Sequence, residues 1–191
     1  LFHIHLSILS FTCLMFCTPV YARPQQNLSY PTTETTLDNG LKVIIREDHR
    51  SPMVMTQIWY AVGSSDEPDN LSGISHALEH MMFKGTTKVP NDEFTRLSRL
   101  YGGSVNAATF TNYTNYYQLY QKDYLALALE LEADRMSNLV LRQQDFETEM
   151  KVVMEERRQR IDDNPRALAF ESFKWIAYPT SHYRQPVIGY M

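Results

Sequence analysis

His76-Ala77-Leu78-Glu79-His80 lies within a stretch whose apolar residues recur at helical spacing. We predict a helix that begins near Asn70 and ends at Gly85. The two histidines are four residues apart, so on a helix they project from the same face, one turn apart. The predicted helix therefore packs an apolar face into the core and presents a polar face. The apolar positions are Leu71, Ile74, Leu78, Met81 and Met82.

This spacing suits a metal site, because two imidazoles one turn apart can reach the same zinc ion. Glu79 lies between the histidines on the same side, within reach of a water molecule at the metal. The order His-x-x-Glu-His is the zincin motif with its glutamate at the other end, the inverted arrangement. The competing interpretation is a polar helix face with two unrelated histidines, a risk that accompanies any short motif.

A catalytic zinc needs three protein ligands and an open position for water. Both cysteines, Cys13 and Cys17, lie in the N-terminal apolar segment, so the third ligand should be a carboxylate or a histidine. A predicted long helix over residues 143–161 supplies the carboxylates, and spacing alone leaves Glu155 and Glu156 both open. The candidates on this helix are Glu147, Glu149, Glu155 and Glu156.

Residues 1–22 contain no Lys, Arg, Asp or Glu, and they end in Val20-Tyr21-Ala22, a small-residue cleavage pattern. We interpret them as a secretory signal segment that lacks its basic start, followed by a linker over residues 23–34. The apolar run over residues 6–20 is short for a membrane span, and an uncleaved anchor is the alternative. The expected location is the periplasm.

Composition indicates a globular protein, with 43% hydrophobic and 21% charged residues. The net charge of −4 is spread along the chain, so we expect no nucleic-acid partner. Strands and helices are predicted in clusters, which favours an α+β fold with a mostly antiparallel sheet. Besides the two helices above, the predicted elements are a hairpin around Asn39-Gly40, strands over 53–62, 104–110 and 112–120, and helices over 91–101, 123–138 and from Pro165.

The motif and its surroundings resemble the pitrilysin-type (M16, inverzincin) zinc metallopeptidases, in the branch of bacterial and mitochondrial processing peptidases. In that family a glutamate ligand follows the His-x-x-Glu-His motif by about 75 residues, and Glu156 lies 76 positions after His80. A second acidic residue precedes the ligand by seven positions, which here is Glu149. The resemblance therefore implies that Glu156 is the ligand and that Glu149 orients it.

Two further segments, over residues 83–86 and 102–109, are typical of this branch, and the resemblance covers residues 35–191. It implies helices packed on one face of the sheet, and an edge strand whose Asn106 and Ala107 hold the substrate backbone by strand addition. Phe83 is expected to contact substrate. Family members are about twice as long, and their second domain completes the active site, so we expect the chain to be an N-terminal fragment with an incomplete site.

The expected function is zinc-dependent hydrolysis of extended peptides or unfolded polypeptides, with one zinc per chain and Glu79 as the general base. Two alternatives stay open. One is a non-catalytic zinc-binding subunit or scaffold of a two-subunit complex, with a homologous subunit as partner. The other is a zinc hydrolase that acts on substrates other than peptides.

Overall fold

The computed structural model describes residues 30–191 except residue 92, and it divides into two compact units, one ending at His49 and one beginning at Arg50. The first unit contributes a hairpin of β1 (Thr32–Thr36) and β2 (Lys42–Arg46), which pair antiparallel. Gly40 adopts a positive φ of 86° in the turn, as the Asn-Gly pair predicts. The predicted signal segment and residues 23–29 of the predicted linker lie outside the described residues. β1 begins at Thr32, inside the predicted linker.

The second unit is built on an antiparallel sheet in the order β3-β5-β4. Its strands are β3 (Met53–Tyr60), β4 (Ser104–Thr109) and β5 (Thr114–Gln121). Exposure alternates along β3 with the period of two that a strand with one covered face requires. β4 is an edge strand of this sheet, and it also contacts α1 (Ile74–Met81).

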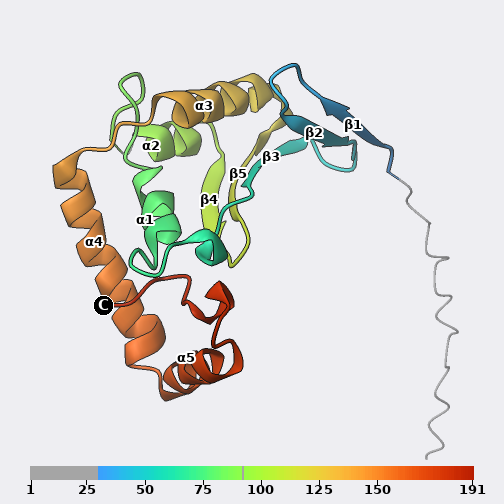
Figure 1. Cartoon of the computed structure of the whole chain (residues 1–191). Coiled ribbons are helices and arrows are strands. Elements are labelled where there is room, and N and C mark those ends of the chain that lie inside the picture. Colours follow the sequence, from blue (N-terminus) through green and yellow to red (C-terminus); the bar gives the residue numbers. More distant parts are fainter. Residues whose placement is uncertain (1–29, 92) are drawn as a thin grey trace, which may run out of the picture. The chain divides into compact units, whose positions relative to one another are not determined.

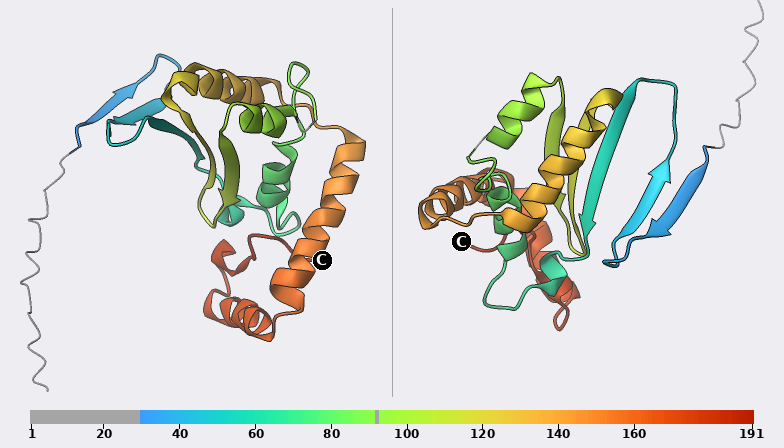
Figure 2. Two further views of the ribbon diagram at one scale, coloured as in Figure 1. Left: turned by 180° about the vertical axis from the view of Figure 1, so that it is seen from behind. Right: turned by 90° about the horizontal axis from the view of Figure 1, so that it is seen from above.

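Helices cover one face of the sheet, as Figures 1 and 2 show for α2 (Glu93–Leu100) and α3 (Leu125–Asn138). The amide of Gln118 on β5 donates to the carbonyl of Ala128 on α3, and the hydroxyl of Tyr120 donates to Ser98 on α2. A buried cluster of Val89, Phe94 and Leu131 fills the space between these layers. The predicted α+β fold with an antiparallel sheet is confirmed.

The C-terminal third is helical. It contains α4 (Gln143–Arg157), a π turn η3 (Arg158–Asp162), α5 (Pro165–Ala177) and a 3₁₀ turn η4 (His182–Arg184). The predicted long helix over 143–161 therefore leaves α-helical geometry after Arg157. α4 lies beside α1 (Figure 1). Among the described residues, none of the helices combines the length and apolarity that crossing a membrane requires.

Two expectations for α1 were wrong. The helix begins at Ile74 instead of near Asn70, because Gly73 has a positive φ of 91° that no helix continues through. Ile74 and Leu78 are also 49% and 45% exposed, whereas His76 is buried. The face of α1 that carries the histidines packs against α4 and β4. The candidate metal ligands therefore lie on the covered side of the helix, and some of its apolar side chains are exposed to solvent.

Candidate metal centre

The start of α1 is fixed by a carboxylate six residues before its N-cap residue, Gly73. The buried side chain of Glu67 accepts hydrogen bonds from the backbone amides of Gly73 (2.7 Å) and Ser75 (2.8 Å). These amides belong to the orphan donors that every helix N-terminus leaves without an intrahelical partner. Glu67 therefore supplies the cap that Gly73, lacking a side chain, cannot provide. The cap fixes the rotation of α1 and with it the direction of both histidines.

His76 and His80 of α1 converge with Glu156 of α4. Oε2 of Glu156 lies 3.7 Å from Nε2 of His76 and 3.4 Å from Nε2 of His80. One ligand atom from each of the three residues lies within 4.8 Å of the other two. Zinc–ligand bonds of about 2.1 Å in tetrahedral geometry place neighbouring ligand atoms roughly 3.4 Å apart. The separations from Glu156 are close to this value, so the cluster could hold a metal ion of this size.

The polar atoms of this cluster also fit a cation. Oε2 of Glu156 is buried and accepts no hydrogen bond from any described residue. Its Oε1 forms an ion pair with Arg160 at 2.8 Å. A buried carboxylate oxygen without a donor is costly unless a positive group satisfies it. Burial, reinforced by the neighbouring His80, lowers the pKa of His76 below its usual range. His76 is thereby kept in the neutral form that a metal ligand must have.

Glu149 lies next to this cluster and orients one histidine. Its Oε2 lies 3.1 Å from Nδ1 of His80, and its Oε1 lies 2.6 Å from the ammonium of Lys84. Although burial alone raises the pKa of the Glu149 carboxyl, the hydrogen bonds from Lys84 and His80 outweigh it and lower that pKa below its ordinary value. The family resemblance implied that Glu149 orients Glu156, and the contact that the structure shows is with His80. A carboxylate on Nδ1 leaves Nε2 free to bind metal.

Glu79 projects from the same helix toward the sheet. The hydroxyl of Thr109, at the end of β4, donates a hydrogen bond of 2.5 Å to Oε2 of Glu79. Glu79 and both histidines line a common cavity of about 810 Å³. The structure therefore brings the predicted base and the three predicted ligands to one cavity.

The predicted substrate-contacting residues also line this cavity, namely Asn106 and Ala107 on β4 and Phe83 just after α1. The side chain of Asn106 accepts from the backbone amide of Ala107 (2.9 Å) and donates to the hydroxyl of Tyr117 (3.1 Å). Asn106 thus satisfies an amide on the outer side of the edge strand, where an added strand would bind.

Glu155, the carboxylate that spacing could not separate from Glu156, points away from the cluster. It is paired with Arg158 and Gln159 on the surface. Reasoning from sequence missed four supporting residues: Glu67, Lys84, Thr109 and Arg160. Only the pair of Glu156 with Arg160 had a local signal, because residues four apart on a helix are neighbours. Glu67 reaches the start of α1 across a short loop, whereas the contacts of Lys84 and Thr109 join segments that only the fold brings together.

Comparison with known protein families and curated proteins identifies relatives. The model of the insulinase family (peptidase family M16) matches residues 42–190. The zinc protease PqqE of Helicobacter pylori is 36% identical over 157 residues, which cover 82% of this chain and 35% of the relative. The β subunit of the mitochondrial-processing peptidase of Rattus norvegicus is 32% identical over 170 residues, 88% of this chain and 34% of that protein. The chain thus spans about a third of the length of these relatives.

Solved structures show the same fold. A protease from Helicobacter pylori superposes with a TM-score of 0.82 at 34% identity, over 85% of this chain and 39% of that one. The periplasmic protease PqqL from Escherichia coli superposes with a TM-score of 0.76 at 23% identity, over 84% of this chain and 18% of that one, which is a likeness of fold alone. The family model covers most of the described residues and includes the whole candidate metal centre. The chain therefore belongs to the insulinase family, peptidase family M16.

Proposed function

We propose that this chain is the metal-binding part of a zinc endopeptidase that cleaves extended peptides or unfolded polypeptides. His76, His80 and Glu156 hold one zinc ion, and Glu79 is the general base. The observation that carries the proposal is the buried Oε2 of Glu156, which accepts no hydrogen bond within the described part of the chain and faces Nε2 of both histidines. The names of the relatives as zinc proteases support the same metal and the same class of reaction.

When bound, zinc would acidify a water molecule and polarise the peptide carbonyl. Glu79 takes the proton of the attacking water at the carboxylate oxygen that Thr109 leaves free. It then returns this proton to the amine nitrogen as the C–N bond breaks. Asn106 and Ala107 hold the substrate backbone along the edge of β4, which gives affinity for extended chains with little dependence on sequence. Phe83 forms part of the cavity wall that contacts substrate side chains.

Zinc content tests the ligand set. Purified protein should contain about one zinc per chain, as a single three-ligand site holds one ion. Glu156→Gln should lose this zinc, and Glu155→Gln should keep it, because Glu155 lies on the surface. Loss in both variants, or in neither, would contradict the assignment.

Activity tests the base. Because the chain spans about a third of its relatives, peptide cleavage should be measured on the complete protein, together with any partner subunit that it requires. Glu79→Gln should keep zinc and lose most of the activity, since a positioned base contributes about 10²-fold to 10⁴-fold. Turnover retained by this variant would assign the base elsewhere.

The main alternative is a non-catalytic zinc-binding subunit that works beside a homologous partner. The relative from Rattus norvegicus is named as one subunit of a processing peptidase, which favours testing for a partner. A complete protein that binds zinc and cleaves no peptide with or without candidate subunits would support this alternative. A panel of non-peptide esters separates peptidase activity from other zinc hydrolysis.

The proposed location is the periplasm, after cleavage behind Ala22. It rests on the uncharged residues 1–22 and their Val20-Tyr21-Ala22 ending. N-terminal sequencing of the protein isolated from its source tests it, and an N-terminus at Arg23 is expected.

A further inference from the structure

Lys84 occupies a fixed position at the junction of the two helices that carry the metal groups. Its backbone amide donates to the carbonyl of Met81 in the last turn of α1 (2.9 Å). Its own carbonyl accepts from the guanidinium of Arg142 (3.4 Å), just before α4. The following residue, Gly85, has a φ of 91°, so the chain turns sharply there. The main chain of Lys84 is thus attached to α1 and to the start of α4.

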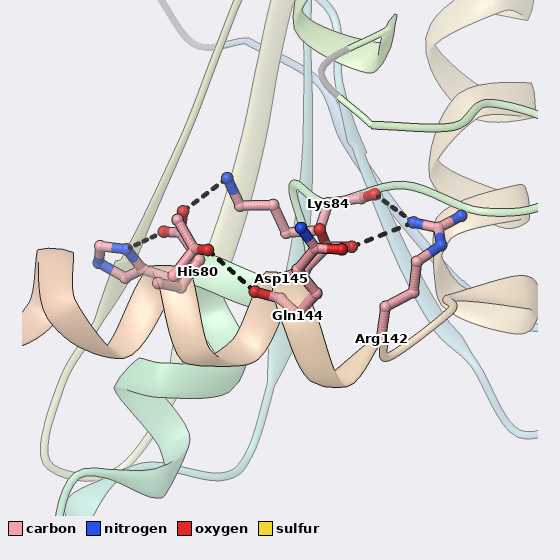
Figure 3. A network of polar contacts seen from close by, with 7 residues as sticks. His80, Lys84, Arg142, Gln144 and Asp145 are labelled. Carbon is pink, nitrogen blue, oxygen red and sulfur yellow. Dashed lines mark hydrogen bonds and ion pairs between the residues drawn. The ribbon is translucent and has the colours of Figure 1, made fainter.

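The side chain of Lys84 runs along α4 to Glu149, about two turns further on. Figure 3 shows Lys84 and His80 turned toward the same part of α4, with Arg142 reaching back to the main chain of Lys84. The ammonium contacts Oε1 of Glu149, whereas His80 contacts Oε2. The ion pair is well shielded, since the side chains of Lys84 and Glu149 are 24% and 10% exposed.

Lys84 and His80 contact different oxygens of the Glu149 carboxylate, so Lys84 can orient this carboxylate without displacing His80. A carboxylate held at Oε1 keeps its other oxygen directed at Nδ1 of His80. Without the ammonium, Glu149 would be a shielded charge with one free oxygen, in the cavity that Glu79 and Glu156 also line. It could then rotate toward the cation and compete with Glu156 as a ligand.

His76 provides an internal comparison. Its Nδ1 is buried and forms no hydrogen bond with any described residue. Among the two histidines, only His80 therefore has its ring orientation and tautomer set by a carboxylate. Lys84 is the cation that secures this carboxylate.

We propose that Lys84 is a positioning residue of the metal centre. Its ammonium fixes Glu149 so that His80 keeps its proton on Nδ1 and presents Nε2 to zinc, and it keeps Glu149 itself from binding the metal. The inference rests on the zinc site proposed above, and it assigns to Lys84 a role in metal affinity that is separate from the stability of the fold.

The test uses Lys84→Met, Lys84→Arg and, as a matched control, Lys88→Met in the full chain. Lys88 also forms a lysine–glutamate ion pair, with Glu130. The side chains of both residues are about 60% exposed, and neither residue lines the metal cavity. Zinc affinity is measured by competition with a chelating dye. Lys84→Met should bind zinc about 10-fold to 100-fold more weakly, the usual effect of removing a group that orients a ligand. Lys84→Arg and Lys88→Met should stay close to wild type.

A second measurement needs no metal. Nitrogen NMR of the imidazoles in metal-free protein, at about pH 8 where imidazole is neutral, should show His80 with its proton on Nδ1. Lys84→Met should show a mixture of tautomers at His80 and an unchanged His76. Thermal unfolding of the same samples separates this effect from loss of folding.

The outcomes are distinguishable. Wild-type zinc affinity in Lys84→Met, or equal losses in Lys84→Met and Lys84→Arg, would overturn the role of Lys84 while the zinc site stands. Absence of zinc binding in wild type would instead contradict the proposed function. The tautomer of His80 would then decide the role of Lys84, and an unchanged tautomer in Lys84→Met would refute it. If Lys84→Met does not fold, the comparison of Lys84→Gln with Lys84→Arg decides by the same criteria.

Discussion

The hydroxyl of Thr109 on β4 donates a hydrogen bond of 2.5 Å to Oε2 of Glu79 on α1. This contact connects the proposed base to the edge strand proposed to hold the substrate. It leaves one carboxylate oxygen of Glu79 for proton transfer. Thr109 therefore has a geometry suited to orienting the base.

Thr109→Val removes the hydroxyl and keeps the shape of the side chain. In the complete protein it should lower kcat about 10-fold to 100-fold, the usual value of a hydrogen bond to a charged group. KM and zinc content should change little, because the hydroxyl contacts neither a proposed ligand nor the substrate backbone. Thr109→Ser should restore most of the rate, and Thr33→Val, on exposed β1, is the control. A fall in zinc content would show that Thr109 supports the fold of the site instead.

Glu67→Gln should destabilise the protein by about 1–3 kcal/mol, because a buried charged acceptor of two amides is replaced by a neutral one. The two amides are those of Gly73 and Ser75 at the start of α1. Thermal unfolding of the metal-free protein measures the loss. Glu34→Gln, whose carboxylate is exposed on β1, should have little effect. Equal unfolding temperatures for the two variants would argue against the cap.

Gly73→Ala should be more destabilising than Gly102→Ala. Both glycines have positive φ angles, 91° and 69°. A methyl group on Gly102 would meet open space, whereas one on Gly73 would lie 2.7 Å from Cα of Gly189. The conformational cost of about 1–2 kcal/mol applies to both, so the difference in unfolding free energy isolates the steric clash. Similar values would mean that the segment around Gly189 moves aside.

Metal-free protein should lose stability as the pH falls below about 6.5, the ordinary pKa of imidazole. Burial lowers the pKa of His76 in the folded state, so below this pH the unfolded chain takes up a proton that the folded chain does not. The free energy of unfolding therefore keeps its full value above the pKa that His76 has in the unfolded chain. It declines as the pH falls further, until the pH reaches the lower pKa that His76 has in the folded protein.

Chemical denaturation between about pH 7.5 and pH 5.5 tests this dependence. His76→Gln should flatten the profile, and His49→Gln, at an exposed position, should not. An unchanged slope in His76→Gln would assign the titration to another group. Zinc should raise stability at each pH and should do so less as the pH falls, because protons compete for its ligands.

The sequence predicted the parts of the site that depend on local geometry. The four-residue step between His76 and His80 places both side chains on one face of any helix. The hairpin turn at Gly40 followed from the conformational preference of Asn-Gly. These features were confirmed because short-range geometry controls them.

Other features depend on which segments the fold brings together. The exposure of Ile74 and Leu78 was missed because apolar periodicity predicts which face of a helix is buried. It does not take into account that the polar face of α1 lines a cavity. The contact of Glu149 with His80 was missed for a related reason. Residues 80 and 149 meet only because α1 packs on α4, and a step of seven along one helix could not reveal that contact.

The close approach of Gly73 and Gly189 has a consequence for how the molecule opens. Arg157, the residue after the proposed ligand Glu156, donates to the carbonyl of Gly189 (2.7 Å), so α4, the start of α1 and residues near 189 meet at one point. Release of any of these segments removes the support of the other two. Their amides should therefore exchange with solvent deuterium as one cooperative unit, with a single opening free energy. Zinc added at the site proposed between α1 and α4 should slow exchange as far away as Gly189.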